Sequence, residues 1–365
     1  MPMRMRCTMG LGVLVGLLLG TACGGGATTS DGDVAPDAGA DDLIADAADV
    51  PDAPPAQPGS VTAVVSGCLA GVGVLPDTTC QTLTIACPDA DDQDVQLRIT
   101  EPPVGVPRRG TVILGSDSGG RQFLFDDKPL ASDLRSDGFR LVQRAWVDGW
   151  TSNVQGNGLV VAACRYATLA RWVRSELAPD EPLCATGNSG GAAEIGEALV
   201  WWDLDDVLDQ AVTTSGPGAA RVDLGCVPDA AWLAQCAAFN EASAVHPSCT
   251  FAENGVDDLI DAAYAPGTPC GDADPGFVER FLADSQLGAG ADLEIRHMRL
   301  DMLLGDRDGL VSFSQTQLFA AQVVTGDGAE VSLEITPEAR HGYPYVEPGA
   351  SVVRARLLDG CVARH

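Results

Sequence analysis

The sequence has 365 residues, of which 45% are hydrophobic, with 22 Lys and Arg against 51 Asp and Glu and a formal net charge of -29 at pH 7. This composition suits a folded chain with a large core and excludes a wholly disordered protein. The charge argues against nucleic acid as a partner and against anionic lipid bound through a basic face, because both need clustered Lys and Arg.

Residues 1–23 have the pattern of an export signal. Arg4 and Arg6 precede an apolar run at 11–19, and the small residues 20–22 resemble a cleavage site. The run is too short to span a membrane as a helix. Cys23 follows directly, which resembles the lipobox of bacterial lipoproteins and makes Cys23 the candidate lipidation residue. We expect export, with a lipid anchor at Cys23 as the only membrane attachment or with plain secretion as the alternative.

An acidic segment follows at residues 24–60. From residue 27 it contains eight aspartates, no Lys or Arg and no aromatic residue. Such a segment buries too little apolar surface to offset the loss of chain entropy on folding, so we predict a disordered tether. The folded domain is then expected to occupy residues 61–365.

From residue 81 onward, short apolar or β-branched runs alternate with amphipathic ones. This alternation predicts an α/β fold, a mostly parallel central sheet with helices on both faces. The wholly apolar run at 111–114, bounded by glycine, is typical of a central strand buried on both sides. The predicted strands are 81–86, 95–100, 111–114, 139–146, 182–186, 211–216, 300–304 and 331–335, and the predicted helices are 133–137, 159–177, 192–202, 314–324 and 350–358.

Residues 222 to about 290 interrupt this alternation with prolines, glycines and four cysteines. We interpret them as an insertion that covers the site, and call them the lid insertion. If Cys7 leaves with the signal and Cys23 carries lipid, ten cysteines remain, and an even number in an exported chain predicts disulfides. The cysteines from 226 to 270 could staple the lid insertion, and Cys164 is a candidate partner of Cys184. No Cys-x-x-Cys pair occurs, so no metal or other cofactor is expected.

A glycine-rich turn at 187–191 places Ser189 between a predicted strand and a predicted helix. It matches Gly-x-Ser-x-Gly, in which glycines let the chain turn sharply and leave the serine hydroxyl exposed. The backbone N–H of Gly190, at the helix start, is a candidate donor to an oxyanion. The alternative is a purely structural glycine turn.

A serine nucleophile needs an imidazole to take its proton and an acid to orient that imidazole. The turn at 305–311 offers Asp306 and Asp308 directly after a predicted strand. An ordinary Asp-Gly turn or a small calcium loop would have the same residue pattern and remains an alternative. His341 follows the next predicted strand, and it is the histidine that lies downstream of these acids and inside the predicted fold.

These three turns, in this order, resemble the nucleophile, acid and base of the α/β-hydrolase family over roughly residues 80–360. The resemblance implies Ser189 as nucleophile, His341 as base and Asp308 as acid, since the acid is the third residue after glycine in the family's Gly-x-x-Asp-x-x-Val form. It also implies a second oxyanion donor from the loop at 115–120, near Ser116 or Asp117.

The sequence therefore predicts an extracytoplasmic serine hydrolase that cleaves a small or polymeric carboxylic ester through an acyl-enzyme. Two alternatives remain open, a serine peptidase of the same fold and a catalytically silent surface lipoprotein that binds a ligand.

Overall fold

The computed structural model describes residues 59–67 and 75–362, all within one compact unit of the chain, residues 48–365. The predicted export signal, Cys23 and nearly all of the predicted tether lie outside the described residues. The first strand already begins at Ser60, the last residue assigned to the tether. In the described ranges, no helix has both the length and the apolar character needed to cross a membrane.

Within these ranges, nine strands form one sheet. Strands β1, β2, β3 and β5 pair in antiparallel fashion, and from β5 onward every neighbouring pair is parallel. In spatial order the strands are β1 (Ser60–Ser66), β2 (Thr78–Ala86), β3 (Gln93–Thr100), β5 (Phe139–Trp146), β4 (Gly110–Gly115), β6 (Leu183–Asn188), β7 (Gln210–Thr214), β9 (Arg299–Arg307) and β11 (Glu330–Arg340). A separate parallel pair joins β8 (Glu294–Ile295) to β10 (Val324–Thr325).

The central strands are short and buried along their whole length. Every residue of β4, β5, β6 and β7 is buried. Parallel strands covered on both faces are expected to show this pattern, because helices shield each side from water.

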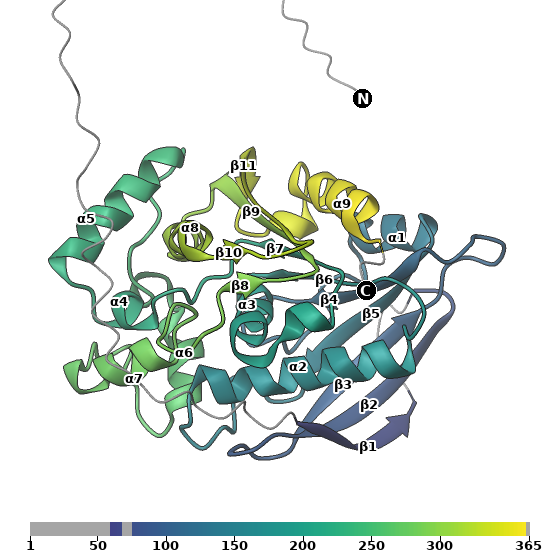
Figure 1. The fold of residues 1–365 in the computed structure, drawn as a ribbon, viewed down its shortest axis with the longest axis horizontal. Helices are drawn as coiled ribbons and strands as arrows, with labels where there is room; N and C mark the ends of the chain where they lie inside the picture. The colour runs from purple at the N-terminus through teal and green to yellow at the C-terminus, as the bar shows by residue number, and fades with distance from the viewer. Residues whose placement is uncertain (1–58, 68–74, 363–365) are drawn as a thin grey trace, which may run out of the picture. The chain divides into compact units, whose positions relative to one another are not determined.

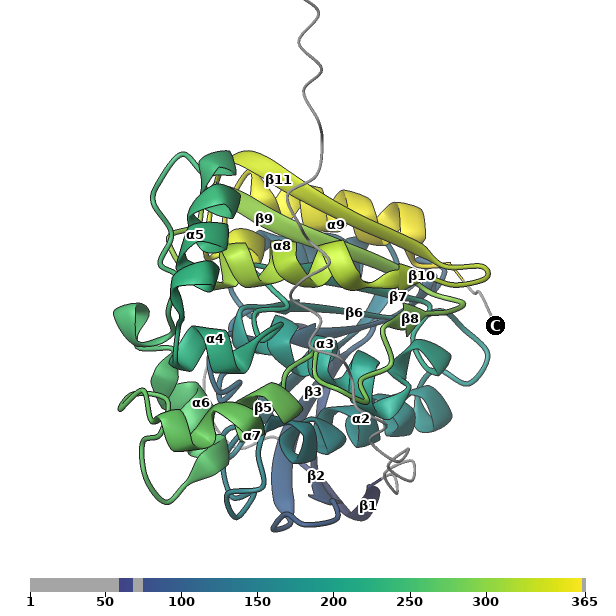
Figure 2. The same ribbon diagram turned by 60° about the vertical axis from the view of Figure 1, so that its left-hand side comes forward.

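Helices cover both faces of the sheet, as Figures 1 and 2 show. Helices α2 (Leu159–Glu176), α3 (Gly190–Trp202) and α8 (Ser312–Gln322) pack into the larger hydrophobic cluster on one face. Helices α1 (Pro129–Ser136) and α9 (Gly349–Gly360) form the smaller cluster on the other. The predicted fold class is confirmed.

The lid insertion contains α4 (Val222–Cys226), α5 (Ala230–Phe239), α6 (Asp257–Tyr264) and α7 (Val278–Ala283). These helices gather on the left in both views of the molecule (Figures 1 and 2). Two disulfides, Cys226–Cys270 and Cys236–Cys249, close loops within it. The cysteines of this segment therefore pair with one another, as expected.

The suggested pairing of Cys164 with Cys184 is wrong. Cys164 is bonded to Cys87, and Cys184 to Cys361. Successive side chains of a strand point to opposite faces, and in β6 the side chain of Cys184 enters the smaller cluster, whereas Cys164 lies in the larger one. The sheet therefore separates the two sulfur atoms. Disulfides in this number fit an oxidising, extracytoplasmic compartment.

Candidate active site

Three strands of the parallel part of the sheet end at the predicted site residues. Ser189 directly follows β6, Asp308 follows β9, and His341 follows β11. Strand β7 pairs with β6 on one side and β9 on the other, and β9 pairs with β11. Because parallel strands end at the same edge of a sheet, side chains from distant parts of the sequence meet there.

Ser189 lies on a sharply turned backbone with φ 53° and ψ -115°. A positive φ is unfavourable for a residue with a Cβ atom, and such strain is typically found at functional sites. The turn also requires Gly187, because a Cβ at that position would lie 2.5 Å from the carbonyl carbon of Gly191. The backbone is held on both sides, since Ser189 N–H donates to Thr214 O over 3.0 Å and Ser189 O accepts from Ala193 N–H over 2.9 Å.

His341 contacts Asp308 through one ring nitrogen. Its Nδ1 lies 3.1 Å from each carboxylate oxygen of Asp308. The Asp308 side chain is fully buried, while that of His341 is 27% exposed. Asp308 Oδ1 also accepts from Leu310 N–H over 3.0 Å. The buried carboxylate is thus positioned to orient the imidazole ring through Nδ1.

Asp306, the other acid of that turn, contacts the lid insertion through its backbone. Its carbonyl oxygen accepts from Ala244 N–H over 2.6 Å and from Ser243 Oγ over 2.8 Å. No group of three or more His, Cys, Asp or Glu side chains in the described part of the chain is arranged to hold a metal ion. Asp308 thus contacts the histidine through its side chain, whereas Asp306 contacts the lid insertion through its backbone carbonyl oxygen.

Ser189 and His341 line one cavity of about 520 Å³, which we call the main cleft. Ser189 also lines a second cavity of about 40 Å³, which we call the small pocket. The serine therefore stands at the junction of a large and a small space. The main cleft is also lined by Asp117, Ser118, Arg121, Gln122, Ser152, Asn254 and Asp258, and the small pocket by Trp150, Leu159, Ala193, Phe251, Ile260 and Val311.

The loop after β4 packs directly on the start of α3. A Cβ at Gly190 would lie 1.9 Å from Ser118 O, so only glycine allows this approach. Of the two predicted loop residues, Asp117 lines the main cleft, whereas Ser116 is buried behind it with 2% of its surface exposed. Burial raises the pKa of the Asp117 carboxyl, and the electrostatic interaction with His341 lowers it by a smaller amount.

A buried ion pair that the sequence analysis missed joins this loop to α3. Arg144 Nη2 lies 2.6 Å from Glu194 Oε2, and both side chains are fully buried. Arg144 Nη1 also donates to Gly120 O over 3.1 Å, and Trp146 Nε1 donates to Glu194 Oε1 over 3.0 Å. Burial raises the pKa of Glu194 to about 7. Arg140 and Gln143 also lie in β5 and Glu197 in α3, so no sequence signal singles out this pair.

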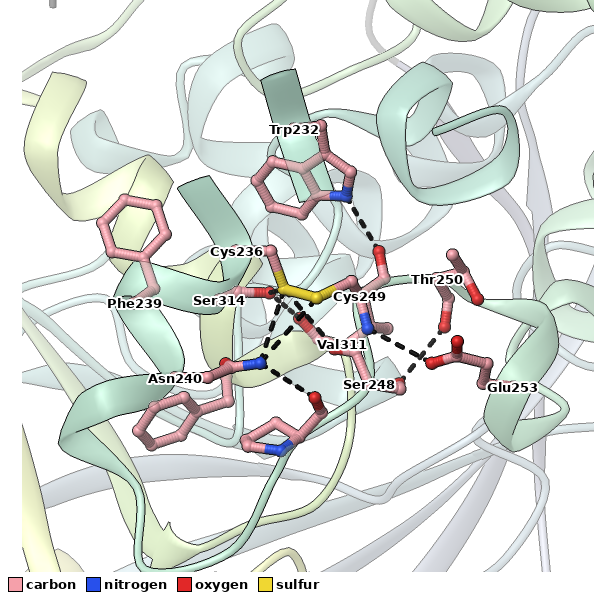
Figure 3. The surroundings of a disulfide bond; sticks show 12 residues. Trp232, Cys236, Phe239, Asn240, Ser248, Cys249, Thr250, Glu253, Val311 and Ser314 are labelled. Atoms are coloured by element: carbon pink, nitrogen blue, oxygen red, sulfur yellow. Dashed lines mark hydrogen bonds between the residues drawn. A yellow bond between two sulfur atoms is a disulfide. The ribbon is translucent and has the colours of Figure 1, made fainter. Parts of the chain in front are cut away.

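The lid insertion reaches the site through the segment around Phe251. Figure 3 shows the Cys236–Cys249 disulfide next to Ser314 of α8, where Cys236 Sγ lies 3.4 Å from Ser314 Oγ. Trp232 Nε1 donates to Cys249 O over 2.8 Å. Two residues further on, the Phe251 side chain lines the small pocket. The disulfide and the Trp232 hydrogen bond thus brace this wall of the small pocket within the lid insertion, and the contact of Cys236 with Ser314 joins it to α8.

No protein-family model matches the sequence, and neither does any curated protein. Among solved structures, brefeldin A esterase, a bacterial homologue of human hormone-sensitive lipase, is 16% identical and aligns over 82% of this chain and 80% of its own, with a TM-score of 0.50. The chain has the α/β-hydrolase fold. Acetyl xylan esterase 1 from Thermoanaerobacterium sp. JW/SL YS485 is 11% identical over 81% of this chain and 87% of its own, with a TM-score of 0.49. Est1E from Butyrivibrio proteoclasticus is 12% identical over 76% of this chain and 98% of its own, with a TM-score of 0.45.

Proposed function

We propose that this protein is an exported serine hydrolase that cleaves carboxylic esters. The observation that carries the proposal is the contact of His341 Nδ1 with the buried Asp308 carboxylate, at the rim of a cleft that the strained Ser189 also lines. A strand-to-helix turn bearing a serine, with a histidine and an acid after later strands, is the arrangement that activates a serine for acyl transfer.

In the proposed mechanism, Ser189 Oγ attacks the ester carbonyl carbon while His341 Nε2 takes the hydroxyl proton. His341 then returns this proton to the departing alcohol, which leaves an acyl group on Ser189. Water, deprotonated by His341, attacks the acyl-enzyme and releases the carboxylic acid. Asp308 stays ionised and stabilises the protonated imidazole throughout.

The negative charge that develops on the carbonyl oxygen needs preorganised donors. We assign one of them to Gly190 N–H at the start of α3. The second is a backbone N–H of the loop at 116–118, which Arg144 and Glu194 hold against α3. This ion pair is therefore proposed to position the oxyanion donors without touching the substrate.

Export is part of the proposal. Disulfides are characteristic of proteins outside the cytoplasm, and four of them join described cysteines, at sequence separations from 13 to 177 residues. We propose that residues 1–23 direct export, that Cys23 carries lipid, that residues 24–60 form a tether and that the lid insertion covers the site. The ester substrate is favoured over an amide by the likeness in fold to brefeldin A esterase.

The direct test is labelling with a fluorophosphonate probe together with hydrolysis of p-nitrophenyl acetate. Ser189→Ala should fold normally, lose all labelling and lower kcat by at least about 10⁴-fold, because the nucleophile is gone. Ser175→Ala, which removes an exposed hydroxyl from α2, is the matched control and should behave as wild type. Labelling that survives in Ser189→Ala would contradict the assignment, and cleavage of amides in preference to esters would favour a peptidase.

A further inference from the structure

We propose that the substrate is a short-chain acyl ester of a neutral, hydroxyl-rich alcohol such as a carbohydrate. This inference rests on the proposed function, and it assigns the acyl group to the small pocket and the alcohol to the main cleft. The two cavities share Ser189, Val256, Leu259 and Leu310, but they differ in volume and in the proportion of polar groups in their walls.

The small pocket limits the acyl chain. A single water molecule requires about 10–15 Å³ of such space, so a volume of about 40 Å³ holds about three non-hydrogen atoms beyond the carbonyl. An acetyl, propionyl or butyryl group fits, and an octanoyl group does not. The walls are apolar, as an alkyl chain requires, and Trp150, Leu159 and Phe251 among them are at most 1% exposed.

The walls of the small pocket are also held firmly. Phe251 N–H donates to Gly225 O over 2.9 Å, and a Cβ at Gly225 would lie 2.2 Å from the Phe251 ring, so the ring packs on the backbone of α4. The Cys236–Cys249 bond lies two residues before it. Ile260 projects from α6 and is 4% exposed. A longer chain would have to displace packed side chains, which is costly in a well-filled core.

The main cleft is larger and has more polar walls, although Val256, Leu259, Ala262 and Leu310 also line it. Its volume of about 520 Å³ is within the range of sites that bind whole small molecules. Hydroxyl, amide, carboxylate and guanidinium groups line it, among them those of Ser118, Arg121, Gln122, Ser152, Asn254 and Asp258. This mixture of donors and acceptors suits an alcohol with several hydroxyl groups, because each hydroxyl both donates and accepts.

The charges of the main cleft disfavour an anionic alcohol. The main cleft contains the carboxylates of Asp117 and Asp258 against the single guanidinium of Arg121 among its described lining residues, and the chain as a whole has a net charge of -29. A sugar acid or a phosphorylated alcohol would be repelled over the whole approach.

The experiment measures kcat/KM of the full-length protein in two series. p-Nitrophenyl acetate, butyrate and octanoate vary the acyl chain, and 6-O-acetylglucose, which keeps its other hydroxyl groups free, against hexyl acetate varies the alcohol. We expect acetate and butyrate to exceed octanoate by at least about tenfold, a difference typical of apolar pockets that discriminate by chain length. We expect kcat/KM for 6-O-acetylglucose to exceed that for hexyl acetate. Octanoate preferred over acetate, or hexyl acetate preferred over the sugar, would overturn the inference.

Two variants, each with a matched control, test which cavity determines the acyl-chain preference and which determines the alcohol preference. Ile260→Ala should raise the octanoate-to-acetate ratio, whereas Ile295→Ala, the same truncation at a buried position outside the small pocket, should not. Asp258→Ala should raise KM for the acetylated sugar, whereas Asp257→Ala, which removes the same charge from the same turn of α6 without lining the main cleft, should not.

The two proposals fail in different ways. If the protein reacts with the fluorophosphonate probe and hydrolyses esters but prefers long chains or apolar alcohols, the substrate class is wrong and the proposed function stands. If it neither reacts with the probe nor hydrolyses any ester, the proposed function is wrong and the substrate class with it.

Discussion

Asp306 and Asp308 are two residues apart and have the same side chain, but they face different parts of the molecule. Asp308→Asn should lower kcat by about 10³–10⁴-fold, because an amide neither fixes the same imidazole tautomer nor stabilises its cation. Asp306→Asn should keep activity near wild type, since Asp306 contacts the lid insertion through its backbone oxygen. Steady-state hydrolysis of p-nitrophenyl acetate distinguishes them, and equal losses in both variants would contradict the assigned role of Asp308.

At the scale of single residues, chain order made the candidates for nucleophile, acid and base predictable. Each candidate follows a strand, and parallel strands end at one edge of the sheet, so Ser189, His341 and an acid of the 305–311 turn could be proposed together. The choice of Asp308 over Asp306 rested on the resemblance to the Gly-x-x-Asp-x-x-Val form of the α/β-hydrolase family. Arg144 and Glu194 were not predictable in this way. Their ion pair joins β5 to α3, and nothing within either segment indicates that its charge meets a partner fifty residues away.

Helix α3 contains a second buried carboxyl group, Glu197, which faces the lid insertion. Its side chain is fully buried, and neither carboxylate oxygen finds a hydrogen-bond partner within the described chain. Burial, reinforced by the nearby Asp284, raises the pKa of Glu197 well above 4.5. Burial also raises the pKa of Asp284 to about 6, although Tyr264 OH donates to it over 2.8 Å.

This environment makes stability depend on pH. Above pH 4.5, the usual pKa of a glutamate, Glu197 releases its proton in the unfolded chain but keeps it in the native one, so the free energy of unfolding falls as pH rises. Above the raised native pKa the dependence stops. Glu197→Gln should remove up to about 1.4 kcal/mol of this fall per pH unit within that window.

Urea denaturation at a series of pH values from 4 upward measures the effect of Glu197→Gln on the free energy of unfolding. Glu279→Gln, which removes the same charge from an exposed position on α7, is the control and should leave the slope unchanged. An unchanged slope in Glu197→Gln would mean that the glutamate ionises in the folded protein as it does in the unfolded one.

At the scale of elements, periodicity identified the central strands and their helices closely. The predicted strand 139–146 coincides with β5, and the predicted helix 159–177 with α2 to within one residue. The pair β8 and β10 was missed because two residues are too few for a pattern, and their pairing arises from tertiary contacts. Strand β1 was missed because it is mostly exposed at the edge of the sheet, where alternation is not enforced by burial.

Across the whole molecule, the Cys184–Cys361 bond connects β6, the strand that carries Ser189, with the end of α9, over a separation of 177 residues. Removing a native disulfide typically costs about 2–5 kcal/mol. We expect Cys184→Ala/Cys361→Ala to lose stability of this size while retaining ester hydrolysis at low temperature, because α3 and the ion pair still hold the turn. Guanidinium denaturation and low-temperature activity measure the two quantities.

Cys236→Ala/Cys249→Ala is the informative comparison, since that bond closes a separation of only 13 residues beside the small pocket. It should alter the acyl-chain preference, which the Cys184–Cys361 variant should not. Loss of chain-length selectivity in the Cys184–Cys361 variant instead would contradict the separation of roles.

The long-range disulfide also dictates an order of events during biosynthesis. A chain that emerges N-terminus first exposes Cys184 long before Cys361, and Cys226, Cys236, Cys249 and Cys270 all appear in between. An oxidant that joined cysteines as they emerged would pair Cys184 with one of these four and trap the β6 strand against the lid insertion. Correct maturation therefore requires that the Cys184 thiol stay reduced until Cys361 emerges, or that a wrong disulfide be exchanged for the correct one. The bond that anchors β6 beneath Ser189 forms only once α9 has been made.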